Sequence, residues 1–183
     1  MADLLPRFFV ITGGPGAGKT TLIASLAREG FAVSHEAGRR IIRAQQAANG
    51  RALPWIDPLL FAQAMLASDL AAYEAMRTAA QPVFFDRGIP DVIGYLRLEG
   101  IDVPAHMRAA ARMHRYQPRV FICPPWPEIY ATDSERKQSP EVAQLTYRAM
   151  VDVYTELGYA LIDVPRASVE RRVSFVREIT RSV

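Results

Sequence analysis

The sequence predicts an α/β fold in which helices cover both faces of a parallel β-sheet. Short, nearly continuous apolar runs alternate with longer amphipathic stretches, which is the pattern of strands joined by crossover helices. Few polar residues interrupt the runs, as expected for strands that are buried on both faces. The composition, with 50% hydrophobic and 22% charged residues among 183, is that of a globular chain.

Turn and capping signals divide the chain into the expected elements. The runs expected to form strands are residues 7–12, 31–34, 82–85, 119–122 and 160–164. The stretches between them predict helices over residues 19–29, 37–48, 58–80, 104–116, 140–157 and 169–181. Asp57 before Pro58 and Ser139 before Pro140 each place a capping side chain ahead of a proline in the first helical turn. A length of 183 residues is close to that of one ordinary domain, so residues 1–183 are expected to form a single domain.

Charge and cysteine content exclude several classes of protein. The 22 basic and 19 acidic residues give a net charge of +3, which is too small for the concentrated basic stripe of a nucleic-acid-binding protein. No apolar stretch approaches the length of a membrane span, and no signal peptide is evident at the N-terminus. Cys123 is the only cysteine, so a disulfide framework is excluded. We expect a cytoplasmic protein that is a monomer or a homodimer.

A glycine-rich loop directly after the first expected strand carries the strongest functional signal. Residues 13–20 match the pattern GxxxxGK[ST] in full and open an amphipathic helix, as that motif requires. Glycines let successive backbone N–H groups point inward at a triphosphate, and the helix N-terminus adds partial positive charge. We expect the nucleotide to contact Gly13, Gly14, Gly16, Ala17, Gly18, Lys19, Thr20 and Thr21. Within this set, Lys19 would bridge the β- and γ-phosphates and the hydroxyl of Thr20 would bind Mg²⁺.

Asp86 is the candidate for the second half of the nucleotide site. It ends the apolar run 82–85, where a phosphate-loop protein places an acidic residue that holds Mg²⁺ directly or through water. Any strand that ends in Asp matches this pattern, so a helix-capping role is the alternative. The phosphate loop favours the metal role.

The residue after Asp86 distinguishes branches of the phosphate-loop proteins. AAA-type ATPases and related motor proteins place a glutamate there to polarise the attacking water, whereas this chain has Arg87 followed by Gly88. An Asp-Arg-Gly sequence at this point resembles the Asp-Arg or Glu-Arg pair of thymidylate, deoxynucleoside and related small-molecule kinases. Arg87 is therefore a candidate to position phosphates or substrate.

Over nearly its whole length the sequence resembles a family of small bacterial phosphate-loop proteins labelled AAA-family ATPases. More distantly it resembles the nicotinamide riboside kinase domain and the nucleoside and nucleotide kinases. The resemblance implies a three-layer phosphate-loop NTPase fold with a five-stranded parallel sheet in the order 2-3-1-4-5. The number of strands expected from the apolar runs agrees, but those runs do not define the order.

Kinases need a carboxylate beside the acceptor hydroxyl, and Glu36 is the candidate. It follows the second expected strand, where similar nucleoside kinases place a glutamate that contacts the acceptor, with an arginine a few residues later. Arg39 or Arg40 could be that arginine. The alternative for Glu36 is an acid in the first turn of a helix, stabilised by the helix dipole.

Two further parts of a kinase are expected after the fourth and fifth strands. The segment at about 127–139 is the candidate lid, with Arg136 as its favoured cation and Lys137 as the second choice. A solvated run of charge is the alternative for this segment. After the fifth strand, Arg166 could stack on the nucleotide base or face solvent, and nothing there separates ATP from GTP.

These candidates together predict a phosphotransferase that uses ATP, or GTP, and Mg²⁺. Lys19, Glu36, Arg87 and Arg136 are its expected catalytic residues, and the acceptor would be a nucleoside, nucleotide or similar metabolite. A nucleotide-dependent switch or slow NTPase without such an acceptor is the alternative.

Overall fold

The computed structural model describes residues 6–129 and 139–181, which form a parallel sheet enclosed by helices. The strands are β1 (Phe8–Gly13), β2 (Ala32–Ser34), β3 (Val83–Asp86), β4 (Arg119–Cys123) and β5 (Ala160–Asp163). Their order in the sheet is β2-β3-β1-β4-β5, so β1, which leads into the phosphate loop, is central. This confirms the expected three-layer α/β fold and its strand order.

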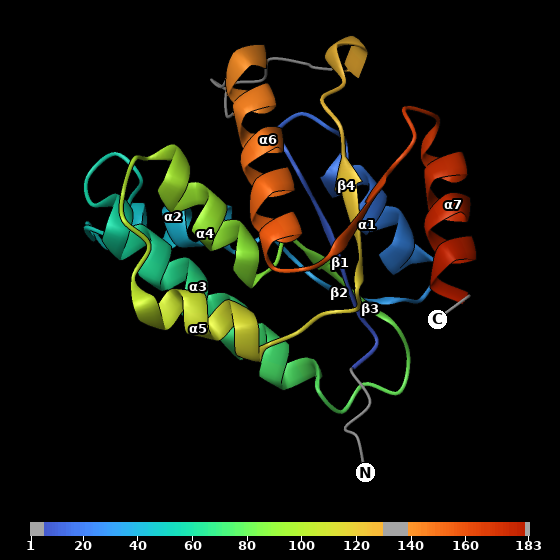
Figure 1. The fold of residues 1–183 in the computed structure, drawn as a ribbon, viewed down its shortest axis with the longest axis horizontal. Coiled ribbons are helices and arrows are strands. Elements are labelled where there is room, and N and C mark those ends of the chain that lie inside the picture. The colour runs from blue at the N-terminus through green and yellow to red at the C-terminus, as the bar shows by residue number, and fades with distance from the viewer. Residues whose placement is uncertain (1–5, 130–138, 182–183) are drawn as a thin grey trace.

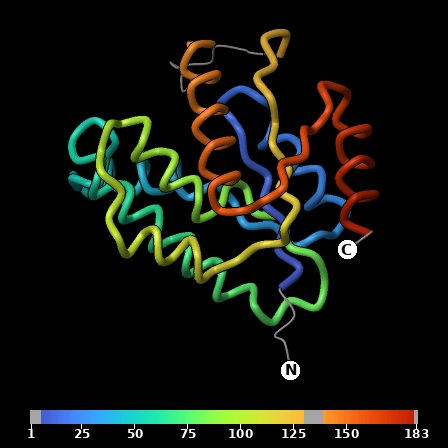
Figure 2. Tube along the Cα trace, in the orientation of Figure 1, coloured from blue at the N-terminus to red at the C-terminus, as the bar shows by residue number. Residues whose placement is uncertain are grey.

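The helices agree with the expected ones, except that one helix was not expected and several end earlier than expected. They are α1 (Lys19–Arg28), α2 (Ala37–Ala47), α3 (Pro58–Met76), α4 (Ile89–Leu98), α5 (Ala105–Met113), α6 (Pro140–Glu156) and α7 (Val169–Arg181). The first and last of these lie side by side although they are far apart in the sequence, as the chain trace in Figure 2 shows. None of the helices in the described ranges combines the length and hydrophobicity needed to cross a bilayer.

Alternate residues of the central strands pack into two separate cores. Phe8 and Val10 of β1 join one hydrophobic cluster, whereas Phe9 and Ile11 join the other. Both faces of the sheet are therefore apolar, which explains why the strands appear in the sequence as continuous hydrophobic runs. Helices α1 and α7 cover one face and α3 to α6 cover the other (Figure 1).

Helix α4 is an element that the sequence analysis missed. Its residues from Ile89 to Gly94 are all buried, so the segment lacks the polar face that marks an amphipathic helix. Its start is instead marked by Gly88 at the N-cap position and by Pro90 in the first turn. The helices expected to end at residues 80 and 116 end earlier, at Met76 and Met113.

Candidate functional site

The phosphate loop joins the carboxyl end of β1 to α1 at the centre of the sheet. Gly13 and Gly18 adopt φ values of 127° and 72°, which side chains other than glycine rarely allow. A Cβ atom at Gly13 would also collide with the backbone of Cys123 in the neighbouring strand β4. These two glycines are thus required by the loop conformation, and not only by the motif.

Lys19 is the first residue of α1 and folds back across the loop. Its side chain is buried, and Nζ donates a hydrogen bond of 2.6 Å to the carbonyl oxygen of Gly14. Burial, with a smaller contribution from the cation of Arg87, lowers the pKa of Lys19 to about 8. A phosphate group beside Nζ would oppose that shift, because negative charge stabilises the ammonium form. Thr20 and Thr21 follow on α1 with exposed side chains.

Asp86 ends β3 and pairs in register with Ile11 of β1, so its side chain lies at the same edge of the sheet as the phosphate loop. One carboxylate oxygen, Oδ1, is buried without a hydrogen-bond partner among the described residues. Burial raises the pKa of Asp86, and Lys19 opposes the rise. The residue does not cap the following helix, because Gly88 occupies the N-cap position of α4. A carboxylate oxygen that lacks a donor fits a cation, and Mg²⁺ commonly uses one or two protein oxygens together with phosphate.

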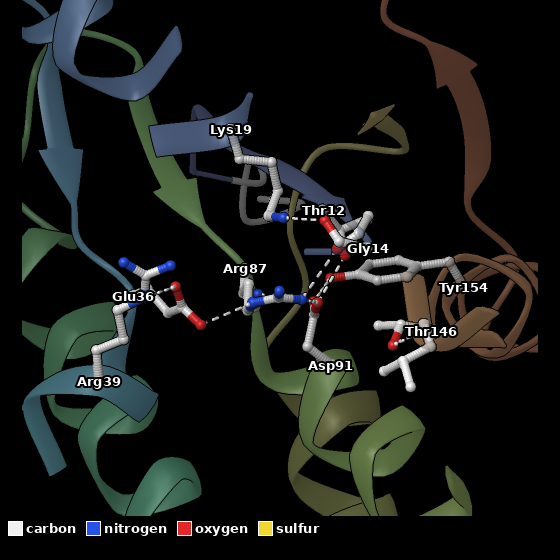
Figure 3. Close-up of polar contacts among 12 residues, drawn as sticks. Thr12, Gly14, Lys19, Glu36, Arg39, Arg87, Asp91, Thr146 and Tyr154 are labelled. Atoms are coloured by element: carbon white, nitrogen blue, oxygen red, sulfur yellow. Dashed lines mark hydrogen bonds and ion pairs between the residues drawn. The ribbon is translucent and has the colours of Figure 1, made fainter. Parts of the chain in front are cut away.

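Glu36 lies at the N-cap position of α2, just after β2, and makes an ion pair with Arg87. Oε1 of Glu36 accepts a hydrogen bond from Nε of Arg87 at 3.2 Å, and Oε2 lies 3.8 Å from Nε of Arg39 (Figure 3). Burial alone would raise the pKa of Glu36, but Arg87, Lys19 and Arg39 together bring it below its ordinary value. The carboxylate is therefore ionised at neutral pH. Arg40 instead donates to Ser68 of α3 and lies outside this contact.

Arg87 connects the acceptor side of the site to the phosphate loop. Its φ of 70° is in the left-handed region, and its backbone N–H donates to the carbonyl oxygen of Ile11. Nη1 donates at 3.2 Å to the carbonyl oxygen of Gly13, the first residue of the loop. Burial would lower the pKa of Arg87, but the carboxylates around it, with Glu36 the strongest, raise it. The structure thus brings Lys19, Glu36, Asp86 and Arg87 into one electrostatic cluster.

Arg172 of α7 is a neighbour of the phosphate loop that the sequence analysis missed. The residue is 3% exposed, and Nη2 donates at 3.0 Å to the carbonyl oxygen of Ala17 and at 3.1 Å to Sγ of Cys123. Nη1 donates to the carbonyl oxygen of Gly18, and the guanidinium lies 5.6 Å from the ring centre of Trp126. The sequence did contain one indication of this, because Arg172 lies next to Val173 on the face of α7 that is buried against the sheet.

The expected roles of two site residues, Arg136 and Arg166, are not tested by the structure. Arg136, with its alternative Lys137, lies outside the described residues, so the lid stays a prediction. Arg166 is exposed in the connection between β5 and α7. Its contact with a nucleotide base also stays a prediction.

Comparison with known proteins identifies the family. A family model described as AAA domain matches residues 8–172. The chain belongs to this AAA-domain family. The resemblance noted from the sequence is thereby confirmed. No curated protein matches the chain significantly.

Solved structures of kinases share the fold of this AAA-domain protein. A deoxyadenosine kinase from M. mycoides with bound dATP aligns with a TM-score of 0.60 at 14% identity, covering 95% of this chain and 99% of the kinase. A thymidylate kinase from Ehrlichia chaffeensis aligns with a TM-score of 0.64 at 16% identity, covering 97% of this chain and 100% of the kinase. At such identities the likeness establishes the fold alone.

Proposed function

We propose that the protein is a phosphotransferase that moves the γ-phosphoryl group of ATP to a small-molecule acceptor. The observation that carries the proposal is the contact between Glu36 and Arg87. Glu36, an ionised carboxylate just after β2, accepts a hydrogen bond from Arg87. The same guanidinium donates a hydrogen bond to Gly13 of the phosphate loop. A hydroxyl acceptor needs such a carboxylate beside it to take up its proton, whereas nucleotide binding alone does not need one.

On the nucleotide side, the loop N–H groups and Lys19 would hold the phosphates. Thr20 and Asp86 would hold Mg²⁺, whose charge offsets that of the β- and γ-phosphates when it is bound. The buried Oδ1 of Asp86, which has no hydrogen-bond partner within residues 6–129 and 139–181, supports this assignment.

On the acceptor side, Glu36 would orient the acceptor hydroxyl and accept its proton as the new oxygen–phosphorus bond forms and the bond to the β-phosphate oxygen breaks. Arg87, and Arg136 from the lid, would place positive charge beside the transferring group. Arg87 also takes the position where a hydrolytic AAA-type ATPase has its glutamate, and this favours transfer over hydrolysis.

Nucleosides and nucleotides are the first acceptors to test. Deoxyadenosine kinase and thymidylate kinase are the named activities of two proteins with this fold. GTP is the alternative phosphoryl donor.

The test is to incubate the purified protein with Mg²⁺, ATP or GTP, and panels of nucleosides, nucleotides and vitamins, with products followed by ³¹P NMR. We expect a phosphorylated acceptor in stoichiometric balance with the nucleoside diphosphate. Diphosphate that forms at the same rate without any acceptor, and without a phosphorylated product, would contradict the proposal and support the switch or slow NTPase.

A further inference from the structure

Asp91, in the first turn of α4, is a buried carboxylate with two donors on each oxygen. Oδ1 accepts from the hydroxyl of Thr12 at 2.6 Å and from Nη1 of Arg87 at 3.1 Å. Oδ2 accepts from the hydroxyl of Tyr154 at 2.6 Å and from the backbone N–H of Gly88 at 3.0 Å. The donors come from β1, α6 and the turn before α4, so three parts of the fold fix the orientation of this carboxylate (Figure 3).

The carboxylates of Asp91 and Glu36 hold the Arg87 guanidinium from different sides. Glu36 accepts from Nε, whereas Asp91 shares Nη1 with the carbonyl oxygen of Gly13. Within the described ranges, Nη2 of Arg87 has no hydrogen-bond partner, and the side chain is 21% exposed. Among the described residues, Nη2 is thus the guanidinium nitrogen that is left to contact a ligand. Its position is set by the hydrogen bonds that Nε and Nη1 make.

We propose that Asp91, itself oriented by Tyr154 and Thr12, is a positioning residue that aims Nη2 of Arg87 at a phosphate oxygen of the reacting substrates. Its kinetic consequence rests on the proposed function, whereas the positioning itself does not. Without Asp91 the guanidinium would keep one carboxylate, that of Glu36, and Nη1 would keep only the uncharged carbonyl oxygen of Gly13, so the direction of Nη2 would be less firmly fixed. A misdirected cation at the transferring group lowers the rate more than it lowers affinity.

Tyr154→Phe is the sharpest test, because it removes one hydroxyl that donates to Asp91 and leaves the ring in the core. Tyr73→Phe is the matched control. Tyr73 is also buried, and its hydroxyl donates at 2.8 Å to the carbonyl oxygen of Arg115, near Phe8 at the opposite end of β1. Asp91→Asn is the second variant, since it keeps the side-chain shape and removes the charge that Arg87 faces.

The first readout is the Nε–H signal of Arg87 in ¹⁵N NMR of the protein without substrates, assigned by its loss in Arg87→Lys. We expect the signal to shift, with hydrogen exchange at least about tenfold faster, in Tyr154→Phe and Asp91→Asn but not in Tyr73→Phe. An unchanged signal in both variants, while they stay folded, would overturn the inference whatever the activity of the protein. If neither the unaltered protein nor any variant transferred a phosphoryl group, that result would count against the proposed function and not against the positioning of Arg87.

The second readout is the kinetics of phosphoryl transfer. We expect kcat about tenfold lower in Tyr154→Phe, with KM for ATP unchanged, because the interaction acts in the transition state. In an Arg87→Ala background, Asp91→Asn should cause no further loss of kcat. An additional loss there would show that Asp91 acts through general stability, and would overturn the inference.

Discussion

The two halves of the site are assembled in different ways. In the phosphate-loop half the main contact, between Lys19 and Gly14, spans five positions of the chain. In the acceptor half, the contacts of Arg87 with Glu36 and of Asp91 with Tyr154 and Thr12 span 51, 63 and 79 positions. Local backbone geometry forms most of the first half, to which Arg172 of α7 adds long-range hydrogen bonds. The second half depends on the order of the strands and on the packing of α4 against α6.

The halves also differ in electrostatic balance. Lys19 is a buried cation whose pKa burial lowers, so the phosphate-loop half is incomplete until negative charge arrives. Arg87 is surrounded by carboxylates that raise its pKa, so the acceptor half is balanced by the protein itself. We infer that the first half responds strongly to nucleotide and that the second is organised before any substrate binds.

The largest effect is expected from Lys19→Ala. Removing the ammonium group should weaken MgATP binding by at least about 100-fold, since a charge-assisted contact to the phosphates is lost. The nucleotide-dependent rise in melting temperature should disappear. Arg28→Ala, which removes a cation from the other end of α1, is the control and should keep that rise. If MgATP still raised the melting temperature of Lys19→Ala, the inference that the phosphate-loop half responds to nucleotide through Lys19 would be wrong.

Glu36→Gln should affect the other half alone. We expect transfer about 100-fold slower, because the amide cannot accept the acceptor's proton, with the dissociation constant of MgATP unchanged. Rate assays and nucleotide titration on the same preparation measure both. Glu29→Gln, an exposed carboxylate paired with Arg177, is the control. Equal transfer rates in Glu36→Gln and the unaltered protein would disprove the assigned role.

Arg172→Leu tests whether the phosphate loop needs support from α7. The carbonyl oxygens of Ala17 and Gly18 would lose their donors, so we expect unfolding to become easier by about 2 kcal/mol and MgATP to bind about tenfold more weakly. Chemical denaturation and nucleotide titration measure the two effects. The adjacent Arg171, which is exposed, provides the control Arg171→Leu. Identical behaviour of the two variants would show that the loop is self-supporting.

The stability of the folded protein should also depend on pH through Lys19. The pKa of Lys19 is about 8 in the folded protein, below the ordinary lysine value of 10.5 that the unfolded chain has, so between these values the unfolded chain binds a proton that the folded chain lacks. The free energy of unfolding should therefore gain up to about 1.4 kcal/mol for each pH unit across this window from Lys19. Chemical denaturation from pH 7 to 10 should show that the free energy of unfolding rises less steeply with pH in Lys19→Met than in the unaltered protein. The same slope in both proteins would mean that burial does not perturb this lysine.

The sequence predicts the phosphate-loop half of the site better than the acceptor half. Gly13 to Thr20 form a contiguous motif with its own strand and helix, so the sequence predicts the loop and its place. The central strands β1, β3 and β4 are almost entirely buried and apolar, so the sequence predicts them from their continuous hydrophobic runs as well. Asp91 belongs to the first part of α4, Ile89 to Gly94, which is buried throughout and gives no amphipathic signal, and its partners Thr12 and Tyr154 are distant in the sequence. Contacts of that kind follow from the packing of α4 and α6, which no local pattern in the sequence indicates.

Nucleotide binding is the step on which the proposed reaction depends, and titration calorimetry with purified protein and Mg²⁺ measures it most directly. We predict one saturable binding event per chain with ATP or GTP, absent in Lys19→Ala and retained in Glu36→Gln. No binding of either triphosphate to the unaltered protein would contradict the proposed function.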